Sequence, residues 1–306
     1  ELAADGYYFN EVSGSLSSAK LALQAFSDLT DSSSVNVNLM THLEKKRVEY
    51  LMDNSKMTFA AAKTQAQTEI MKIFNIDNVT LGNSETLDIS KSGDGNAVLL
   101  AISAILQSDK TEAELTELLS TINTDIRTDG TLDSTNTKAT LVTAMEYLKS
   151  RRSTIRTNIE SRYSNLGITA TIPAFESYAF KLDTTAPTVS SNTPADGANT
   201  DLNSISVTFS DVVDNTTLTT STFTVTDNSS NSVSGTVSSS DNTTAKNTTV
   251  TFIAQSSLPA GTYTATVSNA VKDIGGNSLV QNYSWSFEIN WVGTKQLGTS
   301  NTDWAT

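Results

Sequence analysis

Several residue types on which enzymes and disulfide scaffolds depend are absent or nearly absent from this sequence. The 306 residues include no cysteine and a single histidine, His42. Disulfide frameworks, thiolate metal sites and cysteine nucleophiles are therefore excluded, and any reaction that needs a histidine must use His42. No run of about 18 consecutive apolar residues occurs, so the sequence offers no candidate membrane-spanning helix. These absences exclude most enzyme templates.

Positive charge is scarce as well. The chain carries 33 acidic and 20 basic residues, a formal net charge of −13 and an isoelectric point near 4.5. This is the wrong sign for a surface that neutralises phosphates or anionic lipids, so nucleic acid is not an expected partner. At roughly 100 to 200 residues per domain, the length predicts two domains.

The two ends of the sequence suggest a piece of a larger protein. The first residue is Glu1 rather than Met, and no segment resembles a signal peptide, so we expect a soluble, processed or excised piece. Apolar residues alternate in two short runs on either side of Ser13-Gly14-Ser15, which predicts a β-hairpin within residues 1–26. Because two strands alone are marginally stable, they complete a sheet of an upstream domain or pack on the helices that follow.

From about Asn38 to Leu166 the apolar residues have the period of helices, and they predict a bundle of about five. The first two helices are marked by Met40 to Leu51 and by Phe59 to Phe74, with Thr58 as N-cap of the second. The segment Ala97 to Leu106 is apolar almost all round and predicts a buried central helix. A capping box, Thr111 to Glu114, begins the fourth helix. Apolar residues from Leu141 to Ile159 predict one long fifth helix, ended by the Gly167 and Pro173 signals.

Three features of the helical part have both a functional and a structural interpretation. His42 has no partner at metal-ligand spacing, so a histidine bonded to backbone is favoured. A basic cluster late in the long helix consists of Lys149, Arg151, Arg152 and Arg156. It could face an acidic partner, but a helix face exposed to solvent is favoured, because the helix dipole favours cations near a C-terminus. The segment Asp88 to Asp94 with Asn96 offers oxygen ligands for calcium, yet it lacks the regular Asp alternation, so a loop that caps a helix is favoured.

Two tracts near the N-terminus carry a resemblance. They are Asp5-Gly6-Tyr7-Tyr8-Phe9-Asn10-Glu11 and Val35-Asn36-Val37-Asn38-Leu39-Met40-Thr41-His42-Leu43. This segment, over roughly the first 180 residues, resembles one found in large repeat-bearing bacterial surface lipoproteins. The resemblance implies a lipid anchor upstream, and it brings no activity or functional residues with it.

Beyond a linker at 183–187, the sequence predicts a β-sandwich. Ser, Thr and Asn make up about half of the residues there, and charge becomes sparse. Apolar and polar residues alternate in seven short runs at the spacing of a sandwich. These runs are Thr188–Ser190, Ile205–Ser210, Thr222–Thr226, Val233–Val237, Thr249–Ile253, Thr262–Ser268 and Tyr283–Ile289.

Several motifs in this part are specific in order and spacing. They include Pro194-Ala195-Asp196-Gly197-Ala198, Gly261-Thr262-Tyr263-Thr264-Ala265-Thr266-Val267 and Val271-Lys272-Asp273-Ile274-Gly275-Gly276-Asn277. Residues 186–290 resemble the bacterial immunoglobulin-like domain of surface-layer proteins, adhesins and secreted repeat proteins. Family members often have Glu-Ala/Pro-Met-Asp where this chain has Asp211-Val212-Val213-Asp214. The resemblance implies a spacer or adhesive module without catalytic residues.

Two further features of the C-terminal part invite interpretation. Asp211 and Asp214 could bind calcium at one end of the sandwich, but two carboxylates three residues apart in a polar loop are more simply solvated. The final tract, residues 291–306, is similar to the opening of a repeat of bacterial β-propeller proteins. One repeat cannot bury its own face, so this resemblance implies that the gene continues.

The sequence therefore predicts an α+β multidomain protein. We assign a β-hairpin to 1–26, a helical domain to 27–182, a linker to 183–187, an immunoglobulin-like sandwich to 188–290 and a truncated repeat to 291–306. We predict no catalytic, cofactor-binding or metal-binding residue, and no cofactor.

The leading functional hypothesis is a non-enzymatic structural or adhesive protein at the bacterial cell surface. Its helical and immunoglobulin-like modules form a stalk or spacer, and its partners are other surface proteins or itself. A second hypothesis is a self-assembling subunit of a surface layer or filament that uses pairing of end strands. A third is an enzyme or a carbohydrate-binding protein, the latter with surface glycans as partners. Its activity would lie outside these 306 residues or in a groove made by Tyr7, Tyr8, Phe9 and Trp291.

Overall fold

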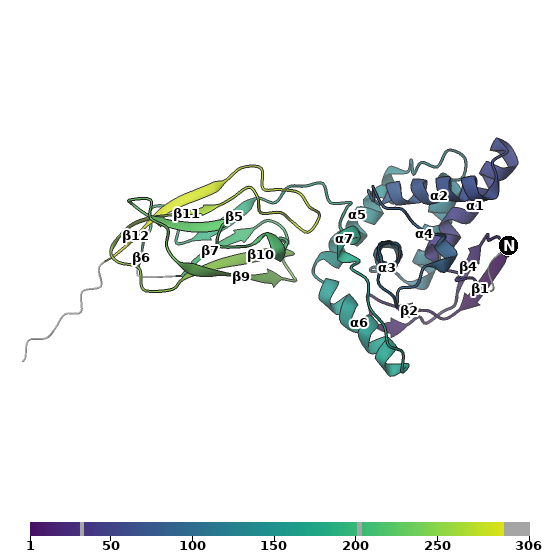
Figure 1. The fold of residues 1–306 in the computed structure, drawn as a ribbon, viewed down its shortest axis with the longest axis horizontal. Helices are drawn as coiled ribbons and strands as arrows, with labels where there is room; N and C mark the ends of the chain where they lie inside the picture. Colours follow the sequence, from purple (N-terminus) through teal and green to yellow (C-terminus); the bar gives the residue numbers. More distant parts are fainter. Residues whose placement is uncertain (31–33, 201–203, 291–306) are drawn as a thin grey trace, which may run out of the picture. The chain divides into compact units, whose positions relative to one another are not determined.

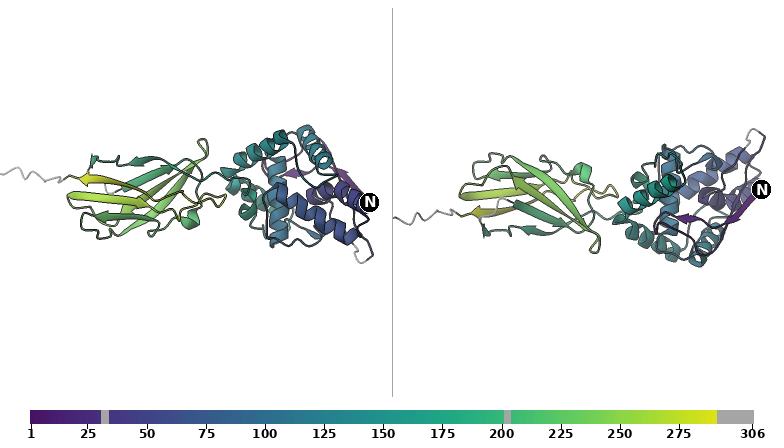
Figure 2. Two further views of the ribbon diagram at one scale, coloured as in Figure 1. Left: turned by 90° about the horizontal axis from the view of Figure 1, so that it is seen from above. Right: turned by 90° about the horizontal axis from the view of Figure 1, so that it is seen from below.

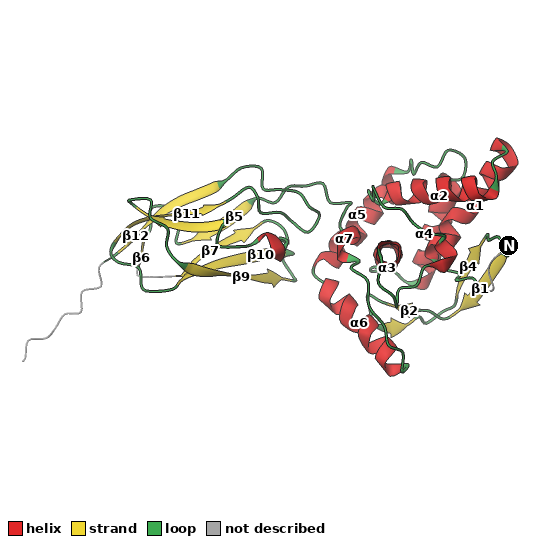
Figure 3. Cartoon of the chain, viewed as in Figure 1, coloured by secondary structure: helices red, strands yellow, loops and turns green. Residues whose placement is uncertain are grey.

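The computed structural model describes residues 1–30, 34–200 and 204–290. It divides the chain into two units, which we call the helical unit (Glu1–Thr185 together with Ile274–Asn277) and the β unit (Ala186–Asp273 and the residues from Ser278 onward). Figure 3 shows the α-helices in the helical unit and most of the strands in the β unit. The predicted α+β multidomain class is confirmed.

The helical unit contains seven α-helices within the described residues. They are α1 (Leu39–Ser55), α2 (Phe59–Ile73), α3 (Asp94–Gln107), α4 (Glu112–Asp125), α5 (Thr135–Lys149), α6 (Arg152–Asn165) and α7 (Glu176–Ala179), with the short 3-10 helix η1 at Ser84–Thr86. Every residue of α3 from Ala97 to Gln107 is buried. In Figure 1, α3 is seen end-on with other helices around it. The predicted central helix is confirmed.

Four of the seven α-helices in the described residues, α1, α2, α4 and α5, begin with a side-chain cap. The Thr58 side chain accepts a hydrogen bond from the Ala61 amide at the start of α2, as predicted. At α4 both bonds of the predicted capping box between Thr111 and Glu114 are present. The same arrangement between Asn38 and Thr41 begins α1 and was not predicted.

The predicted long fifth helix is wrong, because α5 and α6 are separate helices that break at Ser150 and Arg151. Arg151 lies over the Tyr147 ring, 3.6 Å from its centroid, and donates to the Tyr147 carbonyl at 3.0 Å. That carbonyl belongs to the last turn of α5, where it lacks an intrahelical partner. The Leu148 carbonyl accepts from the amide of Arg151, which closes the turn. The break is thus accompanied by local contacts within one turn of the chain, which a continuous apolar stripe does not reveal.

The N-terminal strands pack on the helices, which was one of the two predicted alternatives. Strand β1 (Leu2–Gly6) pairs antiparallel with β4 (Leu21–Ala25), and between them β2 (Phe9–Asn10) pairs with β3 (Ser15–Leu16). Leu21 and Val12 belong to the same buried cluster as α3. Gly14 has a φ of 73°, and a Cβ there would lie 2.7 Å from the Asn158 side chain, so this turn requires glycine.

The β unit consists of two four-stranded sheets with the strand order of an immunoglobulin fold. One sheet has the order β5-β7-β10-β9 and the other β6-β12-β11-β8. The strands are β5 (Val189–Thr193), β6 (Asn199–Thr200), β7 (Ser204–Phe209), β8 (Phe223–Asp227), β9 (Gly235–Asn242), β10 (Asn247–Ala254), β11 (Gly261–Val267) and β12 (Tyr283–Ile289). Figure 2 shows these strands in two further views. Neighbours pair antiparallel except β6 and β12, which are parallel.

The β unit has its own aromatic core. Phe223 lies between Phe252 and Trp285, with ring centroids 5.9 and 6.0 Å from its own. All seven predicted runs overlap observed strands. Two details differ: β6 was not predicted, and β9 extends over five polar residues beyond Val237. Those residues pair with β10, so backbone ladder bonds rather than an apolar pattern define them.

Candidate functional site

His42 has a structural role in the helical unit. Its Nδ1 atom accepts a hydrogen bond from the Gln24 amide at 3.1 Å, which joins α1 to strand β4. Burial, with Lys46 and Lys45 nearby, lowers the pKa of His42 to about 4. The neutral imidazole therefore serves as a fixed acceptor at neutral pH, in accordance with the predicted backbone bond.

The basic cluster is not a solvated helix face, so that prediction is wrong. Lys149 is buried, and its Nζ lies 2.6 Å from Asp183 and 2.9 Å from Glu146. The Arg156 guanidinium contacts both Glu176 oxygens and donates to the Ile172 and Pro173 carbonyls. These cations are held by acidic and carbonyl groups of the same chain, in positions that the sequence spacing does not show.

The loop before α3 is closed by its own polar groups. The Asp88 carboxylate accepts from the amide and hydroxyl of Ser90 and pairs with Lys91. Asn96 accepts from the Asp88 amide and donates to the carbonyls of Lys91 and Ser92. The segment leads directly into α3, but the N-cap residue is Gly93 and no side chain caps this helix, so these polar groups close the loop rather than cap the helix.

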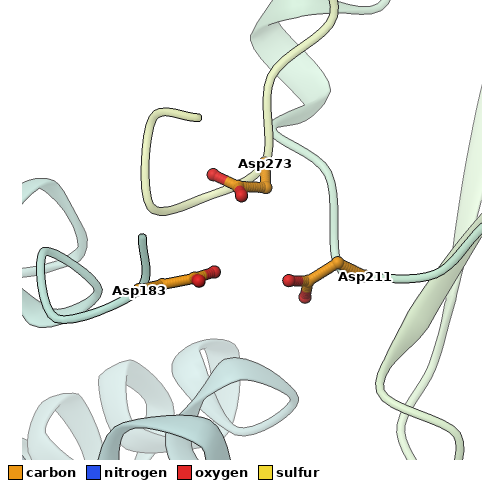
Figure 4. A group of neighbouring side chains, drawn as sticks. All are labelled: Asp183, Asp211 and Asp273. Atoms are coloured by element: carbon orange, nitrogen blue, oxygen red, sulfur yellow. The ribbon is translucent and has the colours of Figure 1, made fainter. Parts of the chain in front are cut away.

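Acidic side chains gather at one end of the β unit. Asp214 caps the short 3-10 helix Asn215–Thr217 by accepting from Thr216. A carboxylate oxygen of Asp211 lies within 4.8 Å of one from the buried Asp273 (Figure 4). Figure 4 also labels Asp183, which pairs with Lys149 inside the helical unit. Calcium takes roughly six to eight oxygen ligands, and the two carboxylates of the β unit fall well short of that number.

Of the four aromatic residues proposed for a carbohydrate groove, three lie within the described residues. Tyr7 is exposed, whereas Tyr8 and Phe9 are half-buried. The Phe9 ring lies 5.5 Å from the Arg162 guanidinium carbon. Trp291 lies outside the described residues. No platform of exposed aromatic rings is formed by the three residues that the structure describes.

A buried charge network joins α1, α2 and η1, and the sequence pattern gave no sign of it. The Lys63 ammonium contacts both Glu44, at 2.6 Å, and Glu85. Lys63 also donates to the Phe26 carbonyl, and the Ser84 hydroxyl donates to Glu44. Burial raises the pKa of Glu44. At Glu85 burial is also the largest single influence, but the hydrogen bonds from Lys63, its own backbone and Ser27, with the charge of Lys63, together outweigh it and lower the pKa.

An open cavity of about 570 Å³ lies on the helical unit, between the N-terminal strands and α3. Its walls are mostly apolar and include Leu21, Leu23, Leu39, Leu87, Leu99 and Leu115. Glu11, Ser103 and Gln107 add polar groups to this lining. Cavities of this size with a few polar groups are typical small-molecule sites.

Two of the polar atoms in this cavity lining lack a partner among the described residues. They are Glu11 Oε2 and Gln107 Oε1, both hydrogen-bond acceptors. Glu11 is 7% exposed and Gln107 is 4% exposed. Burial raises the pKa of Glu11 to about 7. Sequence reasoning missed Glu11 because its burial depends on packing between the β2–β3 turn and α3.

The comparisons with known proteins bear on the β unit. Residues 183–289 match the family model of a bacterial Ig-like domain. The strand order of the two sheets agrees with this match, because an Ig fold pairs its strands in the same way. The Ig-like domain of this chain carries its aromatic core without a disulfide. No curated protein sequence matches the chain significantly.

Solved structures resemble the chain weakly. PcoC, a methionine-rich copper resistance protein from Escherichia coli, is 17% identical, and the match covers 35% of this chain and 100% of that chain, with a TM-score of 0.28. Surface layer protein SbsC, domains 1–6, is 15% identical over 82% of this chain and 32% of that chain, with a TM-score of 0.27. The S-layer protein rSbsC(31-844) is 14% identical over 81% of this chain and 44% of that chain, with a TM-score of 0.27. Likenesses this weak do not bear on function.

Two sequence-based expectations remain untested. The resemblance of the helical part to surface lipoproteins stays a prediction. The propeller-like tract at 291–306 lies outside the described residues. Among the helices of the described part, none has the length and apolar character needed to cross a membrane.

Proposed function

We propose that this chain is part of a bacterial cell-surface protein, in which it serves as a non-catalytic structural spacer. The observation that carries the proposal is the Ig-like domain at 183–289, which has the strand order and closed core of its fold. Modules of this kind present a stable body without needing an active site.

The absence of catalysis is also part of the proposal, and the polar contacts support it. The single histidine is neutral at pH 7 and already bonded to the Gln24 amide. The carboxylates of Glu44 and Glu85 share Lys63 inside the helical unit rather than facing an open cleft. The Ser84 hydroxyl, which donates to Glu44, is fully buried with it, so a substrate cannot reach this pair as it reaches the nucleophile and base of covalent catalysis.

The experiment is surface labelling of intact source cells. An antibody raised against the purified 306-residue chain should label intact cells, and protease added outside should remove the signal. A cytoplasmic enzyme of the same cells, probed in parallel, should stay protected until lysis. Labelling that needs lysis would overturn the surface assignment.

A second candidate function, self-assembly through an end strand, is favoured by the edge strand β9. This strand pairs with β10 over eight residues without a bulge, and its side chains beyond Val237 are exposed. It contains neither Lys nor Pro, two residues with which proteins commonly protect sheet edges. A second copy of the chain could therefore add a strand at this edge.

This candidate is tested by the concentration dependence of the mass in sedimentation. If β9 mediates assembly, the average molecular mass of the wild type should increase with protein concentration. The double variant Ser238→Lys with Ser240→Lys should remain a monomer. Ile253→Lys is the matched control, because Ile253 is exposed on the inner strand β10 of the same sheet. A wild type that stays monomeric at every concentration contradicts the idea.

A further inference from the structure

The buried charge network of the helical unit holds one amine against two carboxyl groups. The Lys63 side chain is 3% exposed, and those of Glu44 and Glu85 are 0% and 5% exposed. Lys63 Nζ lies 2.6 Å from Glu44 Oε1 and also contacts a Glu85 oxygen. An amine that is held against a carboxyl group in one fixed geometry has the positioning that bond formation requires.

Apolar side chains adjoin this network. The Lys63 ammonium lies 5.8 Å from the centroid of the Phe59 ring. Phe59 in turn packs, together with Phe26, on the buried cluster of Val48, Leu51, Ala62 and Ala66. An amine and a carboxyl group are less strongly favoured in their charged forms beside such groups than in water.

The two carboxyl groups differ in their partners. Glu85 accepts a hydrogen bond from the Ser27 hydroxyl at 2.9 Å as well as from Lys63, and its pKa is lowered. Glu44 Oε2 has no partner within the described residues, and burial raises the pKa of this group. Glu85 is therefore the carboxylate of the network, and Glu44 is its neutral carboxylic acid.

We propose that Lys63 and Glu44 form an intramolecular amide bond, which links α2 covalently to α1. Glu85 takes a proton from the Lys63 ammonium, and the neutral amine then attacks the carboxyl carbon of Glu44. The bond between Nζ and Cδ forms, and the bond between Cδ and the Glu44 hydroxyl oxygen breaks. Glu85 passes its proton to that hydroxyl group, which leaves as water, and then takes the second surplus proton from the nitrogen. Neither oxidant nor any other reactant is consumed.

Neighbouring groups support this reaction. The Ser84 hydroxyl donates to Glu44 Oε1, the oxygen on which negative charge develops when the amine adds to the carbon. Lys63 donates to the Phe26 carbonyl at 3.2 Å, which helps to fix the amine. The burial that keeps an outside substrate away does not hinder a reaction between two side chains of the same chain. The amide would close a loop from Glu44 to Lys63 and so restrict the unfolded chain.

The test is the intact mass of the full chain under denaturing conditions. The wild type should be lighter than its sequence by one water molecule, about 18 Da. Lys63→Met removes the amine and should have the full mass of its own sequence. Lys72→Met is the matched control, because it removes an exposed lysine from the same helix and should keep the loss.

The role of Glu85 is tested by Glu85→Gln, which keeps the amine and the Glu44 carboxyl group but removes the base. The cross-linked fraction, followed with time after expression, should rise about 100-fold or more slowly than in the wild type. An unchanged rate would overturn the assignment of Glu85 as the base.

Peptide mapping locates the lost water, because an N-terminal glutamate such as Glu1 can also lose water by cyclising. Digestion of the wild type should give a branched peptide that contains both Lys63 and Glu44. This measurement needs no variant, so it decides the question even if Lys63→Met fails to fold. A wild type of full sequence mass, a loss that persists in Lys63→Met, or a branch at Glu85 would overturn the proposal. The outcome does not depend on where the protein is located in the cell.

Discussion

At the scale of single residues, burial rather than sequence context decides how Glu11 behaves. The carboxyl lies in an apolar cavity lining, and its pKa rises to about 7. An acid whose pKa is raised in the folded state stabilises the fold fully below its unfolded pKa and loses that contribution as the pH rises through the folded value. Glu11 therefore favours the folded helical unit in acid.

This gives a prediction for stability as a function of pH. Relative to Glu11→Gln, the wild type should lose roughly 3 kcal/mol of unfolding free energy between about pH 4.5 and about pH 8.5. Urea unfolding at a series of pH values measures the difference. Glu117→Gln keeps Glu11 and should lose stability with pH as the wild type does, and a wild type parallel to Glu11→Gln at all pH values would contradict the prediction.

The buried Lys63 gives a second prediction at this scale. Lys63→Met leaves the buried Glu44 and Glu85 without their shared cation, so the helical unit should lose about 3 to 5 kcal/mol of stability. Lys72→Met, at an exposed position of α2, should change stability little. Adding Glu44→Gln and Glu85→Gln to Lys63→Met should recover part of the loss in chemical denaturation. A loss that this triple variant does not reduce would mean that charge is not its cause.

At the scale of elements, the first turn of α4 can be tested by one substitution. The Thr111 side chain accepts a hydrogen bond from the Glu114 amide and so caps the helix. Thr111→Ala should lower the unfolding free energy by about 1 kcal/mol. Thr116→Ala is the control and should raise the unfolding free energy, because Thr116 is an exposed residue in the interior of the α4 sequence and alanine has the higher helix propensity. Thermal unfolding of both variants should give shifts of opposite sign, and equal shifts would rule out a capping effect.

The elements also show what local pattern can and cannot predict. Alternation in runs such as Ile205 to Phe209 predicts a strand with one buried face, and the structure has it. Capping residues likewise predict helix starts, because their bonds span only three residues. The break between α5 and α6 is accompanied by the contact of Arg151 with the Tyr147 ring, which apolar spacing does not reveal. The apolar spacing from Leu148 to Ile155 fits an unbroken helix equally well.

The residues of the candidate site could not be predicted from the sequence pattern. Glu11 and Gln107 are separated by most of the helical unit in sequence, and neither belongs to a motif. Their burial results from packing of the N-terminal strands on α3. A polar residue in an expected hairpin turn is ordinarily solvated, so only the tertiary arrangement marks Glu11 as unusual.

At the scale of the whole molecule, each unit carries a hydrophobic core of its own. The core of the helical unit is centred on α3, and that of the β unit on Phe223, Phe252 and Trp285. Two separate cores predict two unfolding transitions, since cooperativity follows shared buried contacts. Calorimetry of the full chain should resolve them when one unit is selectively destabilised.

The variant Phe252→Ala provides that selectivity. Removal of a buried phenylalanine costs about 3 to 5 kcal/mol, so the transition of the β unit should move to lower temperature. The circular dichroism signal of strands identifies the transition of the β unit. The helical signal at 222 nm should melt at the same temperature as in the wild type. Lys63→Met should do the reverse, lowering the helical transition alone. If either variant moves both transitions together, the two cores unfold as one cooperative system and the division into separate units does not extend to stability.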